Sequence, residues 1–233
     1  MRDRVIVALD NMDQAQVNNF LPLIRGKIGT VKVGLELYYR TGPHFVRDLH
    51  QQGFAIFLDL KLHDIPHTVA QAIDALAGLP LKFLTIHLSG GPAMVAAAAA
   101  KAREVLPQTT LLGVSFLTSL DHHDLNHMFG LAPNQIAPAF KRFFTIAAEN
   151  NLGLILSPHE LPLAVEVENA THPLLKVCPG IRFADDQKND QKRISTPQDA
   201  FAHHADYVVI GRALTQAPPA LLGQRLELLA APC

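Results

Sequence analysis

The sequence predicts an α/β protein in which eight parallel strands close into a (β/α)8 barrel, the TIM-barrel architecture. Short apolar runs rich in β-branched residues recur roughly every 30 residues along the 233-residue chain. A segment with helical character follows each run, and this regular alternation requires a parallel sheet. Eight such units fit the ~250 residues that are typical of a (β/α)8 barrel. A doubly wound open sheet is the alternative.

The expected strands are almost continuously apolar, as strands buried on both faces should be. They cover residues 5–9, 31–35, 55–60, 83–88, 111–117, 152–156, 176–178 and 207–210. The expected helices, several of which begin with a proline near the first turn, cover residues 13–25, 43–52, 66–77, 92–106, 134–150, 159–167, 197–203 and 214–229. The long interval after the fifth strand leaves room for an insertion at residues 121–132 above the barrel. No linker divides the chain, so residues 1–233 are expected to form a single domain.

The composition excludes several classes of protein. With 48% hydrophobic and 18% charged residues, the chain can bury a large core and is not expected to be disordered. Its net charge of −1 argues against nucleic acid as a partner, since a nucleic-acid binder carries a basic stripe. No apolar run reaches the ~18 residues of a membrane-spanning helix, and no signal-peptide core precedes Asp10. Cys178 and Cys233 form no disulfide framework or zinc motif, so a cytoplasmic location is expected.

Isolated charges stand where the predicted strands end, which is where (β/α)8 barrels carry their active sites. Asp59 and Lys61 are two residues apart on the third strand, so their side chains share a face that should point into the barrel. Lys32 on the second strand can reach the same space, and Asp10 ends the first strand. Because charges are almost never buried unless they are paired, we expect an alternating Lys–Asp–Lys–Asp cluster in this space. A buried ion-pair network without chemistry is the alternative, although such pairs stabilise proteins poorly.

The eighth strand–helix unit carries a pattern typical of phosphate binding. The strand runs through Gly211 into a helix that begins near Arg212. A glycine lets a phosphate approach the backbone N–H groups, and an arginine offers a bidentate fork. The loops after the seventh and eighth strands commonly hold phosphate in this fold, so Gly180, Arg182 and the loop at residues 185–193 are expected to complete the pocket. No GxxxxGKS/T motif is present, which excludes a nucleoside-triphosphate loop.

Residues 57–69, FLDLKLHDIPHTV, closely resemble the signature D-x-K-x-x-D-I-P-x-T of the orotidine 5'-phosphate decarboxylase family. Further segments match this family in its order and spacing, so the resemblance covers nearly the whole chain. They are Val7-Ala8-Leu9-Asp10, Val31-Lys32-Val33-Gly34, His87-Leu88-Ser89-Gly90-Gly91, Leu117-Thr118-Ser119, Pro179-Gly180-Ile181-Arg182, Asp190-Gln191-Lys192-Arg193 and Ile210-Gly211-Arg212. The sequence departs from the usual pattern at His67, where asparagine is more common, and at Leu88, where alanine is.

The resemblance implies catalytic roles for Lys32, Asp59, Lys61 and Asp64, with Lys61 between the two aspartates, and a substrate-binding role for Asp10. Asp10 would bind the ribose and the pyrimidine end of the substrate. Lys32 would hold a ribose hydroxyl and pair with the carboxylates of the third strand. Asp59 would face the substrate carboxylate, and Lys61 would be the proton donor.

The resemblance also implies how the rest of the substrate is held. Gln191, Arg212 and the Gly211 N–H would hold the phosphate, with Arg182 at the same end. Thr118 would contact the pyrimidine edge, with Ser119 as the alternative. The resemblance also implies an obligate homodimer with shared sites. In such a dimer Asp64 and Thr68 would reach into the site of the partner subunit.

The implied reaction is the decarboxylation of orotidine 5'-monophosphate to uridine 5'-monophosphate, the last step of de novo pyrimidine biosynthesis. No cofactor is expected, because no metal, pyridoxal or thiamine motif is visible and the 12 histidines include no HExxH. One alternative is a Mg2+-dependent sugar-phosphate decarboxylase or aldolase of the same superfamily. Lys32, and the residues Ile65-Pro66-x-Thr68 at the end of the signature, disfavour this alternative. The other alternative is a non-catalytic nucleotide-phosphate sensor, which would not need Lys61.

Overall fold

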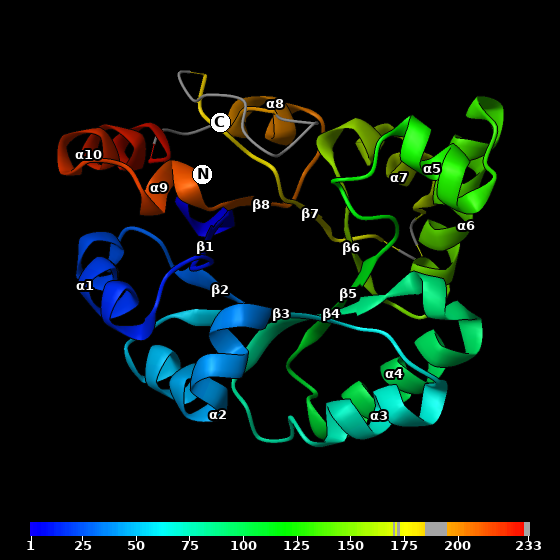
Figure 1. Cartoon of the computed structure of the whole chain (residues 1–233), viewed down its shortest axis with the longest axis horizontal. Helices are drawn as coiled ribbons and strands as arrows, with labels where there is room; N and C mark the ends of the chain where they lie inside the picture. Colours follow the sequence, from blue (N-terminus) through cyan, green and yellow to red (C-terminus); the bar gives the residue numbers. More distant parts are fainter. Residues whose placement is uncertain (170, 172, 185–194, 231–233) are drawn as a thin grey trace.

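The computed structural model describes residues 1–169, 171, 173–184 and 195–230. Its strands are parallel, and each pairs with the next along the chain around a closed barrel (Figure 1). They are β1 (Val5–Ala8), β2 (Thr30–Gly34), β3 (Ala55–Leu62), β4 (Leu81–His87), β5 (Thr110–Val114), β6 (Gly153–Ile155), β7 (Lys176–Cys178) and β8 (Tyr207–Ile210). Because β1 pairs with β8, the barrel is closed. The predicted (β/α)8 architecture is confirmed, and the alternative of an open sheet is wrong.

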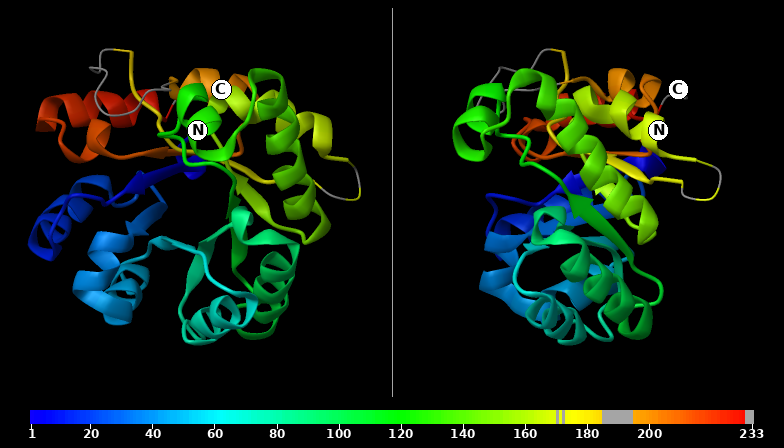
Figure 2. Two further views of the ribbon diagram at one scale, coloured as in Figure 1. Left: turned by 45° about the vertical axis from the view of Figure 1, so that its right-hand side comes forward. Right: turned by 90° about the vertical axis from the view of Figure 1, so that its right-hand side faces the viewer.

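Helices connect successive strands on the outside of the barrel (Figures 1 and 2). They are α1 (Gln14–Ile24), α2 (Leu35–Gln51), α3 (Pro66–Asp74), α4 (Gly91–Val105), α5 (His122–Phe129), α6 (Pro133–Glu149), α7 (Leu161–Val167), α8 (Pro197–Ala202), α9 (Arg212–Thr215) and α10 (Pro219–Leu228). Figure 2 shows α1 and α2 across the barrel from α6. Among the described residues, no helix is long and apolar enough to cross a membrane.

The alternation of side chains along the strands divides the core into two layers. Residues such as Ile6 and Ala8 point into the barrel, whereas Val5 and Val7 pack under the helices. The inner layer consists of Ile6, Ala8, Phe57, Phe83, Leu112, Val114, Ile155, Val177 and Val209. Asp59 is two residues beyond Phe57 and continues this inward-facing row. The apolar inner layer therefore forms a floor beneath the charged residues at the barrel mouth.

Two expected helices differ from the structure at glycine and proline residues. The helix expected at residues 43–52 is the second part of α2, which begins at Leu35 and bends at Gly42, where φ is 69°. Leu35 therefore belongs to this helix and not to the preceding strand. The helix expected at residues 214–229 is two helices, α9 and α10, separated around Pro218. Proline lacks an N–H donor and disfavours helical backbone at the residue before it, so the helix cannot continue.

The expected insertion at residues 121–132 contains α5. The strand expected at residues 111–117 ends at Val114, and a loop leads from there to α5. The ring of Phe116 in this loop contacts both Phe129 of α5 and Phe140 of α6, with ring centroids 5.2 and 5.1 Å apart. These aromatic contacts hold the insertion against α6.

Candidate active site

Four charged side chains meet at the carboxyl ends of β1, β2 and β3. Lys32 Nζ donates hydrogen bonds to both carboxylate oxygens of Asp10, at 2.9 and 2.7 Å. The same Nζ lies 3.3 Å from Asp59 Oδ2. Lys61 Nζ donates to both oxygens of Asp59, at 2.8 Å each. The four side chains form a continuous series of alternating charges in the order Asp10, Lys32, Asp59 and Lys61, which we call the charge network.

The middle of the charge network is buried, with relative exposures of 7% for Lys32 and 8% for Asp59. Burial by itself lowers the pKa of Lys32, but the carboxylates of Asp59 and Asp10 outweigh burial and raise this pKa above its usual value. Burial by itself raises the pKa of Asp59, but the ammonium groups of Lys32 and Lys61 outweigh it and hold this pKa below its usual value. Lys32 and Asp59 therefore both stay charged at neutral pH.

Gly34, the last residue of β2, makes room for the Asp10–Lys32 pair. A Cβ atom at this position would lie 2.5 Å from Asp10 Oδ1 and 3.3 Å from Lys32 Nζ. The close approach of these two groups therefore depends on a residue without a side chain. Gly34 lies in the segment Val31-Lys32-Val33-Gly34, which matches the family, but no pattern in the sequence predicts this role.

Thr85 of β4 also belongs to the site, although it is not among the residues that the sequence predicts there. It is fully buried. Its hydroxyl accepts a hydrogen bond from the Lys61 N–H at 2.8 Å and donates one to Asp59 Oδ1 at 2.9 Å. The only signal in the sequence is one hydroxyl within an apolar strand, and that signal is weak because threonine is common in strands.

A cavity of about 260 Å³ joins the charge network to the residues expected at the phosphate end. Asp10 and Lys32 line one part of it, and Arg182, Gly211 and Arg212 line another. A Cβ atom at Gly211 would meet nothing closer than the Ala8 side chain at 3.6 Å, so a ligand can approach this backbone. The structure thus brings residues from both ends of the chain to one cavity with two guanidinium groups, which suits an anionic ligand.

Asp64 and Thr68 lie apart from the charge network within this chain. Both are exposed, in the loop after β3 and in the first turn of α3. Asp64 Oδ1 accepts the Ile65 N–H at 2.6 Å. Among the described residues, no ion pair joins Asp64 to Lys61, so Asp10 and not Asp64 completes the alternating charges in one chain.

Two further expected contacts stay predictions. Thr118 is half-buried and Ser119 is exposed, both in a turn after β5, and neither lines the cavity described above. Gln191 lies outside the described residues, together with the rest of the segment 185–194.

Two histidine rings lie beside the charge network. The ring centroids of His63 and His87 are 5.1 Å apart. Burial, together with the nearby His63 and Lys61, lowers the pKa of His87 to about 4, so its imidazole is neutral at pH 7. Both histidines line a larger cavity of about 770 Å³ whose other walls are mostly apolar. They therefore line an apolar space near the charge network.

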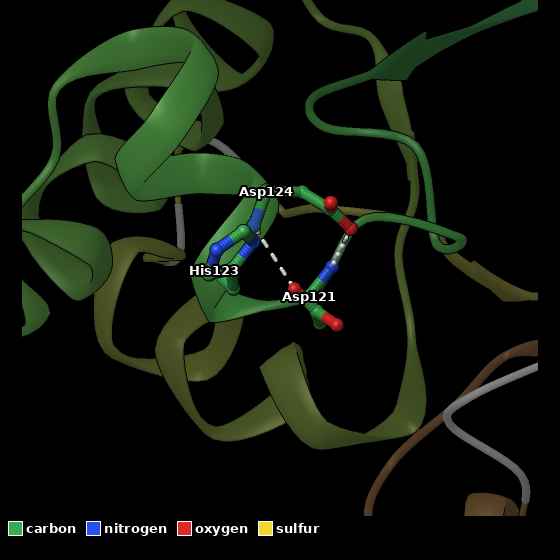
Figure 3. Close-up of side chains that lie close together, drawn as sticks. All are labelled: Asp121, His123 and Asp124. Carbon is green, nitrogen blue, oxygen red and sulfur yellow. Dashed lines mark hydrogen bonds between the residues drawn. The ribbon is translucent and has the colours of Figure 1, made fainter.

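A cluster of potential metal ligands lies away from this site, at the start of α5 (Figure 3). It consists of Asp121, His123 and Asp124. The Asp121 carboxylate accepts the Asp124 N–H at 2.9 Å, and the Asp124 carboxylate accepts the Asp121 N–H at 3.0 Å. These reciprocal bonds are a capping box that begins the helix. Helix capping therefore accounts for this arrangement without a metal ion.

The fold and the site together define a class of protein. The chain is a (β/α)8 barrel with a charge network and an arginine-lined cavity at the carboxyl ends of its strands, the position of the active site in enzymes of this fold. The chain belongs to the orotidine 5'-phosphate decarboxylase / HUMPS family, whose model matches residues 3–221. The resemblance expected from the sequence is thus confirmed.

Individual relatives agree with this assignment. The orotidine 5'-phosphate decarboxylase of Bacillus caldolyticus is 40% identical over 222 residues, which cover 93% of this chain and 90% of the relative. The enzyme of that name from Vibrio cholerae is 40% identical over 220 residues, with 92% of each chain covered. The crystal structure of orotidine 5'-phosphate decarboxylase from Lactobacillus acidophilus matches with a TM-score of 0.78 and 32% identity over 98% of both chains.

Proposed function

We propose that this chain, as a single catalytic domain of residues 1–233, converts orotidine 5'-monophosphate into uridine 5'-monophosphate and CO2 without a cofactor, the last step of de novo pyrimidine biosynthesis. The charge network carries the proposal, because it places a lysine ammonium and an ionised carboxylate 2.8 Å apart at the barrel mouth. The names of the relatives that are 40% identical support this choice of substrate.

Lys61 and Asp59 would act directly on the reacting carbon. When the substrate carboxylate leaves as CO2, the electron pair of the broken bond stays on a ring carbon. The Lys61 ammonium stabilises this negative charge and then transfers a proton to the carbon, so that uridine 5'-monophosphate forms and Lys61 is left neutral until it takes a proton from water. Asp59 faces the substrate carboxylate and keeps Lys61 in place.

The phosphate would bind far from the reacting bond. Arg212, the Gly211 N–H and Gln191 hold the phosphate in this proposal, with Arg182 at the same end. Asp10 and Lys32 hold the ribose. Thr118, or Ser119 in its place, contacts the pyrimidine. The cavity that joins Asp10 and Lys32 to the two arginines supports this direction of binding. Binding energy from the phosphate can then be used to assemble the site around the transition state.

We further propose that the enzyme is a homodimer with shared sites. Asp64 and Thr68 project from the region just after β3 and are exposed in the single chain. Ile65, between them, has 65% of its surface exposed in the single chain, so a partner subunit could cover it. A second subunit that covers Ile65 would receive Asp64 and Thr68 in its own site.

A Mg2+-dependent sugar-phosphate reaction is the alternative activity, and the arrangement of donors disfavours it. In such a site the carboxylates have to offer free oxygen atoms to the metal ion. Here both oxygens of Asp59 accept hydrogen bonds from Lys61, and Lys32 lies 3.3 Å away. Both Asp59 oxygens therefore already interact with ammonium groups.

The proposed function is tested by incubating the purified protein with orotidine 5'-monophosphate in a buffer that contains a metal chelator. We expect the pyrimidine absorbance to change as uridine 5'-monophosphate forms, and CO2 to appear in equal amount. Binding without turnover would instead indicate a nucleotide sensor. Turnover of a sugar phosphate that stops on chelation would indicate the Mg2+-dependent alternative.

A further inference from the structure

Strand β3 leaves its regular pairing with β4 at the residues that carry the charge network. Leu58 pairs with Leu84, but the next paired residue of β3 is Leu62, which pairs with Ile86. The strand β3 therefore bulges between these two pairs. Lys61, inside the bulge, has a φ of 49°, in the left-handed region that a lysine rarely adopts. Local preference does not favour this backbone, so surrounding contacts must hold it.

Thr85 is the residue of β4 that lies between the two regular pairs, opposite the bulge. Its hydroxyl oxygen accepts the Lys61 N–H at 2.8 Å, and its hydroxyl proton is donated to Asp59 Oδ1 at 2.9 Å. The Lys61 ammonium binds the same Asp59 carboxylate at 2.8 Å. One hydroxyl thus holds the backbone of the lysine and the carboxylate that binds its ammonium. Because Thr85 is 0% exposed, water does not compete for either bond.

We propose that Thr85 is a positioning residue for the reaction. Its hydroxyl fixes the direction in which the Lys61 ammonium and the Asp59 carboxylate face each other, and through them the place of the proton donor relative to the reacting carbon. This inference rests on the proposed function. It goes beyond that function because Thr85 does not line the cavity and, being fully buried, does not contact the substrate.

A purely structural role would give a different result. If Thr85 only satisfied buried polar groups, its loss would lower stability and leave the rate constant of the folded enzyme unchanged. A positioning role requires that turnover falls while nucleotide binding persists, since a displaced preorganised group costs on the order of 100-fold in rate.

Three variants separate these roles. Thr85→Val keeps the shape of the side chain and removes both hydrogen bonds, and Thr85→Ser keeps the hydroxyl. Thr109→Val is the matched control, because the Thr109 hydroxyl donates to the Leu81 carbonyl at 2.9 Å, at the opposite end of β4. Thr85→Ala is a second hydroxyl-free variant, for use if the valine variant does not fold. For each we would measure kcat, KM, the Kd for uridine 5'-monophosphate and the urea midpoint.

We expect Thr85→Val to lower kcat by about 10- to 100-fold, with less than a threefold change in the Kd for uridine 5'-monophosphate. Thr85→Ser should stay within about threefold of the wild-type kcat. Thr109→Val should lower the urea midpoint with no change in kcat.

Several outcomes would overturn the inference. A wild-type kcat in the folded valine or alanine variant would show that the hydroxyl positions nothing. If the serine variant folds and neither hydroxyl-free variant does, the role is structural. An inactive wild-type protein would overturn the proposed function and this inference with it, whereas an active wild type with an unaffected valine variant would overturn this inference alone.

Discussion

Lys61 is the residue on which the proposed chemistry depends most directly. Its ammonium is held by Asp59 and would act on charge that exists only in the transition state. We expect Lys61→Ala to lower kcat by at least about 1000-fold, while the Kd for uridine 5'-monophosphate changes less than tenfold. Steady-state kinetics and calorimetry check this. Lys101→Ala in α4, where the ammonium pairs with Asp74 and Glu104, is the control and should be fully active; near-normal activity of Lys61→Ala would refute the assigned role.

Arg212 tests the phosphate end of the cavity. A hydrogen bond to a charged group contributes about 1.5–3 kcal/mol, so Arg212→Ala should weaken binding of uridine 5'-monophosphate by about 10- to 100-fold. Binding of uridine, which has no phosphate, should be nearly unchanged. Titration of both ligands against this variant and against the surface control Arg103→Ala checks the assignment. Equal losses for nucleotide and nucleoside would place Arg212 away from the phosphate.

His87 links stability to pH. The pKa of this imidazole falls from 6.5 to about 4 on folding, chiefly because of burial. Between these pH values the unfolded chain binds more protons than the folded one, so the free energy of unfolding decreases as the pH falls from about 6.5 to about 4. We expect His87→Asn to flatten this decrease. Urea midpoints at several pH values, with the exposed His44→Asn as control, measure the effect, and an unchanged slope in His87→Asn would contradict it.

At the scale of elements, close packing of strands depends on glycines. A Cβ atom at Gly153 of β6 would lie 2.8 Å from the Leu175 carbonyl oxygen and 2.7 Å from the Leu112 side chain. A backbone atom cannot move aside as a flexible side chain can, so Gly153→Ala should lower the free energy of unfolding by about 1–3 kcal/mol. Gly223→Ala in α10, where a Cβ atom would meet nothing within 4 Å, should be neutral or stabilising. Urea unfolding compares the two variants, and equal effects would contradict this account.

Element type follows from local patterns, whereas element boundaries depend on individual residues. Every expected strand and helix is present, because apolar runs and proline starts are local signals. The observed helix boundaries differ from the expected ones at Gly42, which bends α2, and at Pro218, which separates α9 from α10. The bulge in β3 was not expected, because it arises from pairing with β4, a strand that is distant in the sequence.

At the scale of the whole molecule, the proposed shared site makes a quantitative prediction. In a twofold dimer, a mixture of Lys61→Ala and Asp64→Ala subunits contains mixed dimers with one doubly altered site and one intact site. Random exchange makes half of the dimers mixed, so about a quarter of the wild-type specific activity should return. Activity is measured after subunit exchange of the two inactive proteins.

A second mixture controls for this experiment. Lys61 and Asp59 contact each other within one chain, so Lys61→Ala mixed with Asp59→Ala leaves every site with a lesion and should recover nothing. If the first mixture also recovers nothing despite proven exchange, Asp64 serves the site of its own chain and the shared-site proposal is wrong.

Sequence patterns alone predict the barrel, the family and most residues of the charge network. Strand–helix alternation is a local property, and Asp10, Lys32, Asp59 and Lys61 stand at strand ends that a closed parallel barrel must bring together. Which of these charges touch follows only from the folded chain, in which Asp10 pairs with Lys32 and Asp64 is exposed. It also shows the roles of Gly34, where a Cβ atom would lie 2.5 Å from Asp10 Oδ1, and of Thr85, whose hydroxyl accepts the Lys61 N–H at 2.8 Å. Such contacts depend on register and on a bulge, and no local pattern of residues encodes either.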